Sequence, residues 1–308
     1  MSRKIAVIGL GHVGSTAAHY IVANGFADDL VLIDPNEDKV IADAIDYQDA
    51  MPNLPFHTNI AVNDYDALKD ADVIISALGD IKLQDNANDD RFAELPFTSV
   101  QVKAVAEKIK ASGFDGIIVA ITNPVDVITS IYQSVTGLPK NHVIGTGTLL
   151  DSARMKRVVA SELHIDSRSV LGYNLGEHGN SQFTAWSTVR VLGHPISEIA
   201  KEKGLDLEKL DKQSREGGFR VFHGKKYTSY GVATAAVRLA NTVLNDALTE
   251  LPVSNYREEY GVYLSYPAIV GRDGIVEQIQ LDLTAEELKK LQISADYIKT
   301  KFAESLGK

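Results

Sequence analysis

The sequence contains no cysteine among its 308 residues. This absence excludes disulfide bonds, thiolate catalysis, iron–sulfur clusters and zinc sites built on sulfur ligands, and it fits a reducing compartment. Long apolar runs are also missing. No stretch approaches the roughly 18 apolar residues that span a bilayer, and the apolar segment at residues 5–10 is too short for a signal peptide. We therefore expect a cytoplasmic protein with no membrane partner.

The sequence also lacks an excess of positive charge. It has 31 lysines and arginines against 41 aspartates and glutamates, and its formal net charge is -10. An acidic protein repels a phosphate backbone unless a basic patch offsets its field, and no such patch is visible in the sequence. We therefore expect no nucleic-acid partner. The contents of 44% hydrophobic and 23% charged residues are typical of globular proteins.

Flexible linkers and repeats are absent as well. The sequence has no Pro-rich or Ser-rich tract, no low-complexity segment and no internal repeat of roughly 20–50 residues. Its length predicts about two domains, so any boundary between them must lie within a compact structure. The pattern of apolar segments changes near residue 146. We therefore place a first domain at residues 1–145 and a second at residues 146–308.

The first half alternates short apolar runs with amphipathic stretches. Helical periodicity appears at residues 13–23 and 97–110, and β-rich runs lie at residues 4–8, 30–33, 73–77, 117–121 and 143–144. This alternation predicts an α/β fold with a doubly wound, Rossmann-type parallel sheet covered on both faces. The second half predicts a mixed α+β catalytic domain, with strands at 169–175, 182–191 and 262–270 and helices at 229–248 and 285–306.

A glycine-rich motif follows the first expected strand and begins a helix. Residues 9–14 read Gly-Leu-Gly-His-Val-Gly. Gly9 permits a tight turn, Gly11 lets the backbone approach a pyrophosphate, and Gly14 allows close helix–strand packing. The helix N-terminus then faces the anion. The motif alone is a weak indicator, because a tight turn without a ligand has the same pattern.

Asp34 strengthens the prediction of a dinucleotide site. It ends the second expected strand, twenty residues after Gly14, where a carboxylate can accept hydrogen bonds from a ribose diol. A cap for the next helix, just before Pro35, is the alternative role. Residues 35–38 contain no arginine that could hold a 2′-phosphate, so the sequence favours NAD over NADP.

Two polar segments of the second half combine residues that suit catalysis. Asp151 and Arg154 lie three residues apart, so they share one face of an expected helix. His178 lies between Gly176 and Gly179 at the end of an apolar strand. Structural roles are the alternative: a helix-dipole contact for Asp151, a surface ion pair for Arg154, and a core or loop position for His178.

Taken together, these motifs resemble the lactate/malate dehydrogenase family along essentially the whole chain. Within the family, the likeness is nearest to dehydrogenases of L-2-hydroxyisocaproate. The matching segments occur in the family's order and spacing: Gly9-x-Gly11-x-x-Gly14, Asp34, Thr122-Asn123-Pro124-Val125-Asp126, Leu150-Asp151-x-x-Arg154 and Gly176-Glu177-His178-Gly179.

The resemblance implies a role for each matching residue. His178 would be the proton donor and acceptor, Asp151 its partner, Arg154 the clamp for the substrate carboxylate and Arg91 a loop arginine that polarises the carbonyl. The remaining expected contacts are Asn123 with nicotinamide and substrate, Thr146 with the carboxamide, Val232 with the nicotinamide ring and Thr228 with the substrate side chain. The resemblance further implies NAD, no metal, and a homo-oligomer, either dimer or tetramer.

These implied roles agree with simple chemistry. Reduction of a 2-oxo acid needs a hydride at C2 and a proton at the oxygen, and imidazole is a natural acid near neutral pH. A carboxylate such as Asp151 would fix the tautomer of His178 and favour its charged form. The planar fork of Arg154 matches a carboxylate with two parallel hydrogen bonds.

The loop before Arg91 bears on the choice of substrate. It carries Asp85, Asp89 and Asp90, and Arg91 is the only arginine between residues 80 and 100. A second substrate carboxylate would therefore lack a partner. The sequence favours medium-chain or branched aliphatic 2-oxo acids of the 2-hydroxyisocaproate type. The alternatives are an L-lactate dehydrogenase and, from other classes, an NAD-dependent glycosidase or a non-catalytic NAD-binding protein.

Overall fold

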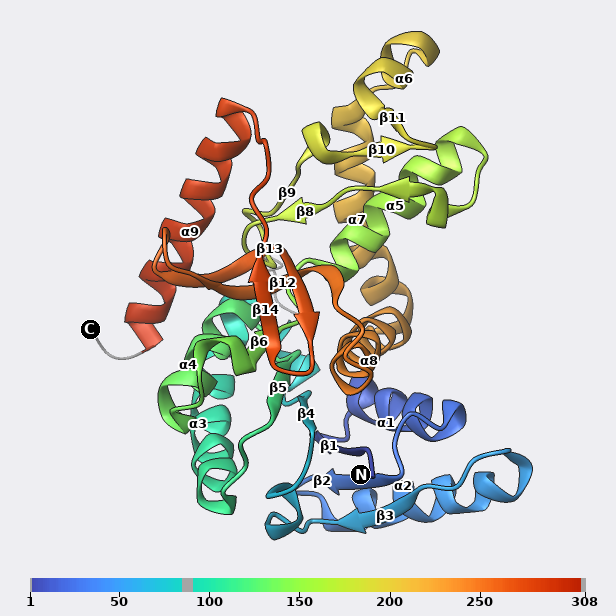
Figure 1. The fold of residues 1–308 in the computed structure, drawn as a ribbon, viewed down its shortest axis with the longest axis vertical. Coiled ribbons are helices and arrows are strands. Elements are labelled where there is room, and N and C mark those ends of the chain that lie inside the picture. The colour runs from blue at the N-terminus through green and yellow to red at the C-terminus, as the bar shows by residue number, and fades with distance from the viewer. Residues whose placement is uncertain (1, 85–90, 306–308) are drawn as a thin grey trace.

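The structure, a computed structural model, describes residues 2–84 and 91–305. A nine-stranded sheet runs through the molecule in the order β14-β13-β12-β6-β5-β4-β1-β2-β3 (Figure 1). The six strands that come first along the chain are parallel. Their order in the sheet, β3-β2-β1-β4-β5-β6, is that of a Rossmann fold. They are β1 (Lys4–Ile8), β2 (Asp29–Ile33), β3 (Asn59–Val62), β4 (Val73–Ser76), β5 (Ile117–Ala120) and β6 (Val143–Gly145). The predicted fold class is confirmed.

Three antiparallel strands from the second half extend the same sheet. They are β12 (Thr249–Arg257), β13 (Val262–Gly271) and β14 (Gly274–Gln278). β12 joins β6 through the pair Ser254 and Gly145. One continuous sheet therefore contains strands from both sides of residue 146.

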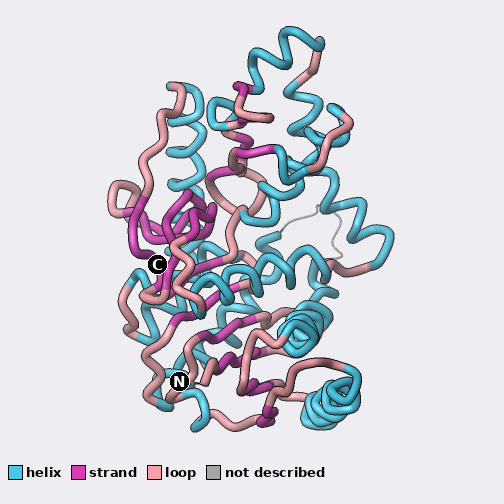
Figure 2. Tube along the Cα trace, turned by 45° about the vertical axis from the view of Figure 1, so that its right-hand side comes forward, coloured by secondary structure: helices cyan, strands magenta, loops and turns pink. Residues whose placement is uncertain are grey.

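Helices cover both faces of the sheet (Figure 2). They are α1 (His12–Asn24), α2 (Glu37–Ala50), α3 (Leu95–Ser112), α4 (Val125–Thr136), α5 (Leu149–Leu163), α6 (Ile196–Lys203), α7 (Leu207–Lys225), α8 (Tyr230–Leu244) and α9 (Ala285–Ser305). Successive residues of β1 alternate between two cores: Ala6 and Ile8 pack with α3, α4 and α9, whereas Ile5 and Val7 pack with α1, α2 and α8. This alternation explains why the parallel strands are apolar throughout.

The prediction of long strands at residues 169–175 and 182–191 is wrong. The first is split into β7 (Val170–Leu171) and β8 (Asn174–Leu175), and the second into β9 (Phe183–Thr184) and β10 (Arg190–Val191). Gly172, with φ of +117°, separates the first two, and a Cβ there would lie 2.7 Å from Val189. In the second segment a 3-10 helix, Trp186–Thr188, interrupts the ladder between the β7–β10 and β8–β9 pairs. β7 and β10 form a small sheet with β11 (His194–Pro195), whereas β8 pairs with β9.

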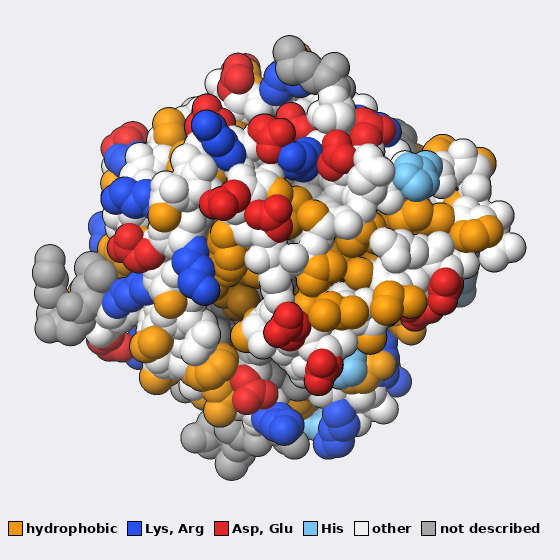
Figure 3. Space-filling model, turned by 90° about the horizontal axis from the view of Figure 1, so that it is seen from below, with side chains coloured by type: hydrophobic (Ala, Val, Ile, Leu, Met, Phe, Trp, Pro, Cys, Tyr) orange, Lys and Arg blue, Asp and Glu red, His pale blue; other side chains and the backbone are white. Residues whose placement is uncertain are grey.

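The surface in Figure 3 mixes side chains of both signs. On this face, and among the described residues, lysines and arginines are interspersed with aspartates and glutamates around a hollow lined by hydrophobic side chains. None of the helices within residues 2–84 and 91–305 is long and apolar enough to cross a membrane.

Candidate active site

A cavity of about 310 Å³ lies at the carboxyl ends of β1, β4, β5 and β6. The order of the sheet reverses between β1 and β4, and such switch points are the usual ligand sites of doubly wound folds. Segments of both halves line the cavity: Gly11, His12, Val13, Ala77, Leu78, Gly79, Asp80, Glu94, Ile121, Thr122, Asn123, Thr146, Gly147, Leu150, Arg154, His178, Gly218, Phe219, Phe222, Tyr227, Thr228, Val232 and Ala235.

The glycine motif forms the loop between β1 and α1. A Cβ at Gly9 would lie 2.8 Å from the Ala77 carbonyl oxygen, and a Cβ at Gly14 would lie 1.7 Å from the Gly9 oxygen, so neither position has room for a side chain. Gly11 differs, because a Cβ there would meet no described atom within 4 Å. Gly11 therefore leaves open space beside the N-terminus of α1, where backbone N–H groups favour an anion.

Asp34 follows β2 and supports the glycine loop. Its Oδ2 accepts a hydrogen bond of 2.6 Å from the Leu10 N–H, and its Oδ1 accepts one of 2.8 Å from the Asn36 N–H. The cap of α2 is Asn36, whose side chain accepts from the Lys39 N–H. Asp34 is thus not the helix cap that the sequence allowed. It fixes the turn in which Gly9 and Gly11 lie.

Two unpartnered polar atoms lie in the wall of the cavity. Within the described part of the chain, the buried Oδ1 of Asn123 and Oγ1 of Thr122 have no hydrogen-bond partner. Buried polar groups are nearly always paired, so these atoms indicate that a bound molecule completes the site. Thr146, Thr228 and Val232 line the same cavity, which brings together the residues for which the sequence predicted nicotinamide and substrate contacts.

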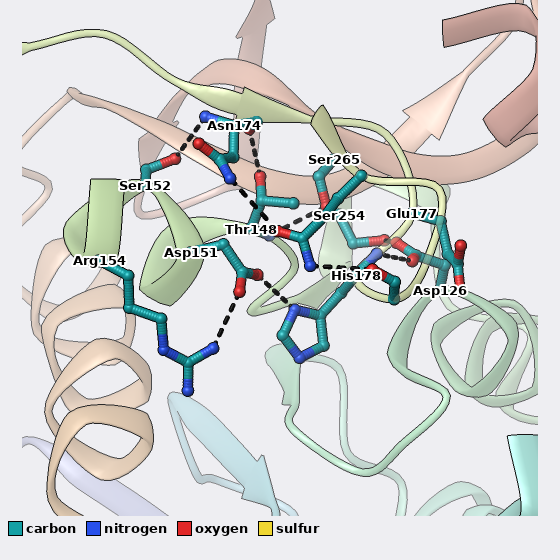
Figure 4. A network of polar contacts seen from close by, with 12 residues as sticks. Asp126, Thr148, Asp151, Ser152, Arg154, Asn174, Glu177, His178, Ser254 and Ser265 are labelled. Atoms are coloured by element: carbon teal, nitrogen blue, oxygen red, sulfur yellow. Dashed lines mark hydrogen bonds and ion pairs between the residues drawn. The ribbon is translucent and has the colours of Figure 1, made fainter. Parts of the chain in front are cut away.

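His178, Asp151 and Arg154 form one connected group (Figure 4). The imidazole Nδ1 lies 2.5 Å from Oδ2 of Asp151, and an Arg154 nitrogen donates to Oδ1 of the same carboxylate at 2.9 Å. Asp151 is only 3% exposed. The ion pair of Arg154 and Asp151 is therefore inside the site rather than on the surface. Since guanidinium carries five N–H donors, this single bond leaves Arg154 able to bind a carboxylate in the cavity.

A second carboxylate, Asp126, supports the histidine from behind. It lies in the first turn of α4, and its Oδ2 accepts the His178 backbone N–H at 2.8 Å. Its Oδ1 accepts from Ser254 Oγ at 2.5 Å. Burial raises the pKa of this carboxyl to about 7, and the nearby charges of Glu177 and Asp151 act in the same direction. The sequence analysis missed this role, although Asp126 closes the motif that contains Asn123.

Most of the predictions for the loop before Arg91 concern residues that the structure does not describe. Asp85, Asp89 and Asp90 lie outside the described residues, and so does the side chain of Arg91, whose backbone begins a short 3-10 helix, Arg91–Glu94. Other cavity residues were not anticipated from the sequence. They include one buried carboxylate and three aromatic rings: Glu94, Phe219, Phe222 and Tyr227.

The fold and the cavity define the class of the protein, a dinucleotide-dependent oxidoreductase. The family model for the NAD binding domain of lactate/malate dehydrogenase matches residues 3–145, and the model for the α/β C-terminal domain of that family matches residues 148–307. The chain belongs to the lactate/malate dehydrogenase family of NAD-dependent 2-hydroxy acid dehydrogenases. The open space at Gly11 and the unpartnered oxygens of Thr122 and Asn123 fit NAD, the cofactor of the family.

Relatives match the chain over nearly its full length. It is 37% identical to L-lactate dehydrogenase 3 of Bacillus cereus, with 97% of this chain and 98% of the relative covered. A solved minor L-lactate dehydrogenase from Enterococcus mundtii, in its ligands-bound form, is 33% identical with a TM-score of 0.92 and 98% of both chains covered. The lactate dehydrogenase of Cryptosporidium parvum, complexed with lactic acid and NAD, is 30% identical with a TM-score of 0.93, covering 99% of this chain and 98% of that one.

The raised pKa of Asp126 predicts a pH-dependent stability. The folded state holds a proton on this group up to about pH 7, whereas an unfolded aspartate releases it near pH 4. The stabilising contribution is complete below about pH 4 and is lost as pH rises through 7. Asp126→Asn removes this titration. The free energy of unfolding of the variant should therefore increase relative to that of wild type as pH rises from about 5 to about 8. Denaturant unfolding at several pH values measures the difference.

Ser130→Ala is the matched control for this measurement. It removes a hydroxyl that donates to the Asp126 carbonyl at 3.0 Å but leaves every ionisable group in place. Its stability difference from wild type should not change with pH. If the Asp126→Asn difference were equally flat, Asp126 would not titrate as its burial implies.

Proposed function

We propose that this chain is an NAD-dependent L-lactate dehydrogenase, which interconverts pyruvate and L-lactate. The observation that carries the proposal is that His178 and Arg154, joined by the buried Asp151, line one cavity beside the glycine motif. The names of the relatives support lactate, since Bacillus cereus and Bifidobacterium longum proteins that cover 96% or more of the chain are L-lactate dehydrogenases. Family membership also favours an oxidoreductase over the glycosidase alternative.

His178 is the acid and base of the proposed reaction. When bound, NAD supplies the hydride chemistry at C2 of the acid. Reduction then requires one proton at the substrate oxygen, and the imidazole delivers it; oxidation of lactate returns the proton to the ring. Asp151 holds Nδ1 at 2.5 Å, which orients the ring and fixes its tautomer.

Arg154 orients the substrate by its carboxylate. Its side chain is 15% exposed and lines the cavity with His178. A guanidinium fork that holds the carboxylate in two hydrogen bonds also fixes which face of C2 meets the cofactor. Because Asp151 contacts both Arg154 and His178, the carboxylate site and the proton donor keep one relative position.

The cavity wall argues against a dicarboxylic substrate. Among the described lining residues, Arg154 is the only arginine or lysine, whereas Asp80 and Glu94 bring negative charge. An additional carboxylate, as in oxaloacetate, would be desolvated without a cationic partner, which costs several kcal/mol. Leu150, Phe219 and Phe222 give the cavity an apolar wall. That wall keeps aliphatic 2-oxo acids larger than pyruvate, the 2-hydroxyisocaproate type, as the second candidate.

Comparison of three substrates tests the proposal. The kcat/KM for pyruvate should exceed that for 2-oxo-4-methylpentanoate, and oxaloacetate should be poorest. The branched acid has three more carbons, and at about 0.8 kcal/mol per buried CH₂ a fitting pocket would favour it by roughly fiftyfold. A pocket too small for it would instead impose an overpacking cost of about 1–3 kcal/mol. A higher kcat/KM for the branched acid would replace lactate dehydrogenase by the 2-hydroxyisocaproate type.

Removal of the imidazole tests the role of His178. His178→Asn should lower kcat by roughly 10²–10⁴-fold, the usual contribution of general acid–base catalysis. Its affinity for NADH, followed by fluorescence titration, should stay near that of wild type. His57→Asn is the control, because His57 is exposed and contacts Asn59 rather than the cavity. Equal losses in the two variants would remove His178 from the reaction.

A change at Asp34 tests cofactor choice. Its carboxylate should repel a 2′-phosphate and accept bonds from the ribose diol, so Asp34→Ser should narrow the preference for NADH over NADPH in kcat/KM. The structure adds a second expected effect. Because Asp34 also holds the Leu10 N–H, the variant should bind NADH more weakly. An unchanged ratio of the two kcat/KM values would show that Asp34 does not contact the ribose.

A further inference from the structure

Two buried serines face each other on the antiparallel strands behind the site. Ser254 of β12 and Ser265 of β13 are directly opposite in the strand register, and neither has exposed surface. Neither residue lines the cavity. The Ser265 hydroxyl instead bonds to the start of the helix that carries Asp151, and the Ser254 hydroxyl bonds to Asp126, which in turn holds the backbone of His178 (Figure 4).

The Ser254 hydroxyl is linked to His178 by hydrogen bonds through Asp126. It donates to Asp126 Oδ1 at 2.5 Å, and Asp126 Oδ2 accepts the His178 backbone N–H at 2.8 Å. Asp126 is 2% exposed, so no solvent competes for either bond. The main chain at His178 is therefore fixed relative to β12 through one carboxylate.

The Ser265 hydroxyl is linked to the helix that carries Asp151. Its Oγ accepts the Thr148 N–H at 3.0 Å, and Thr148 is the N-terminal cap residue of α5, the helix that carries Asp151. The backbone of Ser265 also exchanges two hydrogen bonds of 3.0 Å with Gly176, two residues before His178. Thr148 Oγ1 in turn donates to the Asn174 carbonyl in β8. The start of α5 and the strand before His178 are thus held by one residue.

We propose that Ser254, Ser265 and Asp126 are positioning residues for the His178–Asp151 pair. We call these three residues the serine frame. The pair joins side chains 27 residues apart, one on α5 and one on the loop after β8. Its geometry therefore depends on how these two backbones lie relative to each other. The serine frame fixes both to opposite positions of one buried hairpin. This inference rests on the proposed function only for its kinetic consequence.

The frame predicts a specific kinetic pattern. Ser254→Ala and Ser265→Ala should lower kcat by roughly 10- to 100-fold, because a displacement of about 1 Å at reacting groups has that effect. NADH affinity should stay unchanged, since neither serine touches the cavity. The isotope effect on kcat with NADH deuterated at the transferred position should increase, because the chemical step becomes slower. The control is Ser130→Ala, which removes a buried hydroxyl from α4 and should behave like wild type.

Substitutions at Asp126 separate positioning from general destabilisation. Asp126→Asn retains an oxygen that can accept the His178 N–H, whereas Asp126→Ala does not. The asparagine variant should therefore recover much of the kcat that the alanine variant loses. It also folds without burying a charge, so it keeps the test decisive if a serine variant fails to fold. Equal kcat values for the two variants would contradict the frame.

The NMR signal of the His178 Nδ1 proton provides a test without turnover. The signal is assigned as the one that is absent from the spectrum of the His178→Asn variant. The signal should shift in Ser254→Ala and Ser265→Ala but not in Ser130→Ala. If wild type reduced no 2-oxo acid while the shifts occurred, the proposed function would fail and the frame would stand. If neither the signal nor kcat differed between the frame variants and Ser130→Ala in an active enzyme, the frame would be wrong.

Discussion

The contact between β6 and β12 determines how the two halves of the site meet. At this junction Ser254 pairs with Gly145, and a Cβ on Gly145 would lie 2.6 Å from Thr129 Oγ1 and 2.8 Å from the Ser254 Cβ. Only glycine allows the antiparallel strands to approach the parallel ones this closely. The junction places the hairpin of β12 and β13 beside the loops that line the cavity. The histidine of the second half thereby reaches the cofactor side of the first.

This arrangement gathers three buried carboxyl groups around one imidazole. Asp126, Asp151 and Glu177 are all buried, and the pKa of Asp126 is raised mainly by its burial and further by the charges of the other two. Burial of a carboxylate is unfavourable unless donors satisfy it. Ser254 supplies a donor to Asp126, and Ser181 donates to Glu177 from both its backbone and its hydroxyl. The site therefore sacrifices stability for a fixed position of His178, as functional sites commonly do.

The sequence predicted those parts of the structure that local patterns determine. The parallel strands are continuous apolar runs, and the glycine motif and Asp34 follow from spacing along the chain. The short strands between residues 170 and 191 were mispredicted because a 3-10 helix at Trp186–Thr188 interrupts their pairing. The edge strand Asn59–Val62 was not predicted, because its apolar run is only three residues long and half-buried. Ser254 and Ser265 carry no motif, since their importance arises only from the register of two strands.

In the proposed reaction, proton transfer and the choice of substrate side chain depend on different elements of the fold. His178 and Asp151 are held from behind by β12, β13 and α4, none of which supplies the apolar wall of the cavity. That wall comes from Phe219 and Phe222 on α7 and from Leu150. Gly218, one residue before Phe219, packs so closely on Arg154 that an added Cβ would lie 3.2 Å from its guanidinium carbon. In the proposed function, a change in the ring at position 219 therefore alters the space for the substrate side chain next to Arg154, while the His178–Asp151 pair keeps its support.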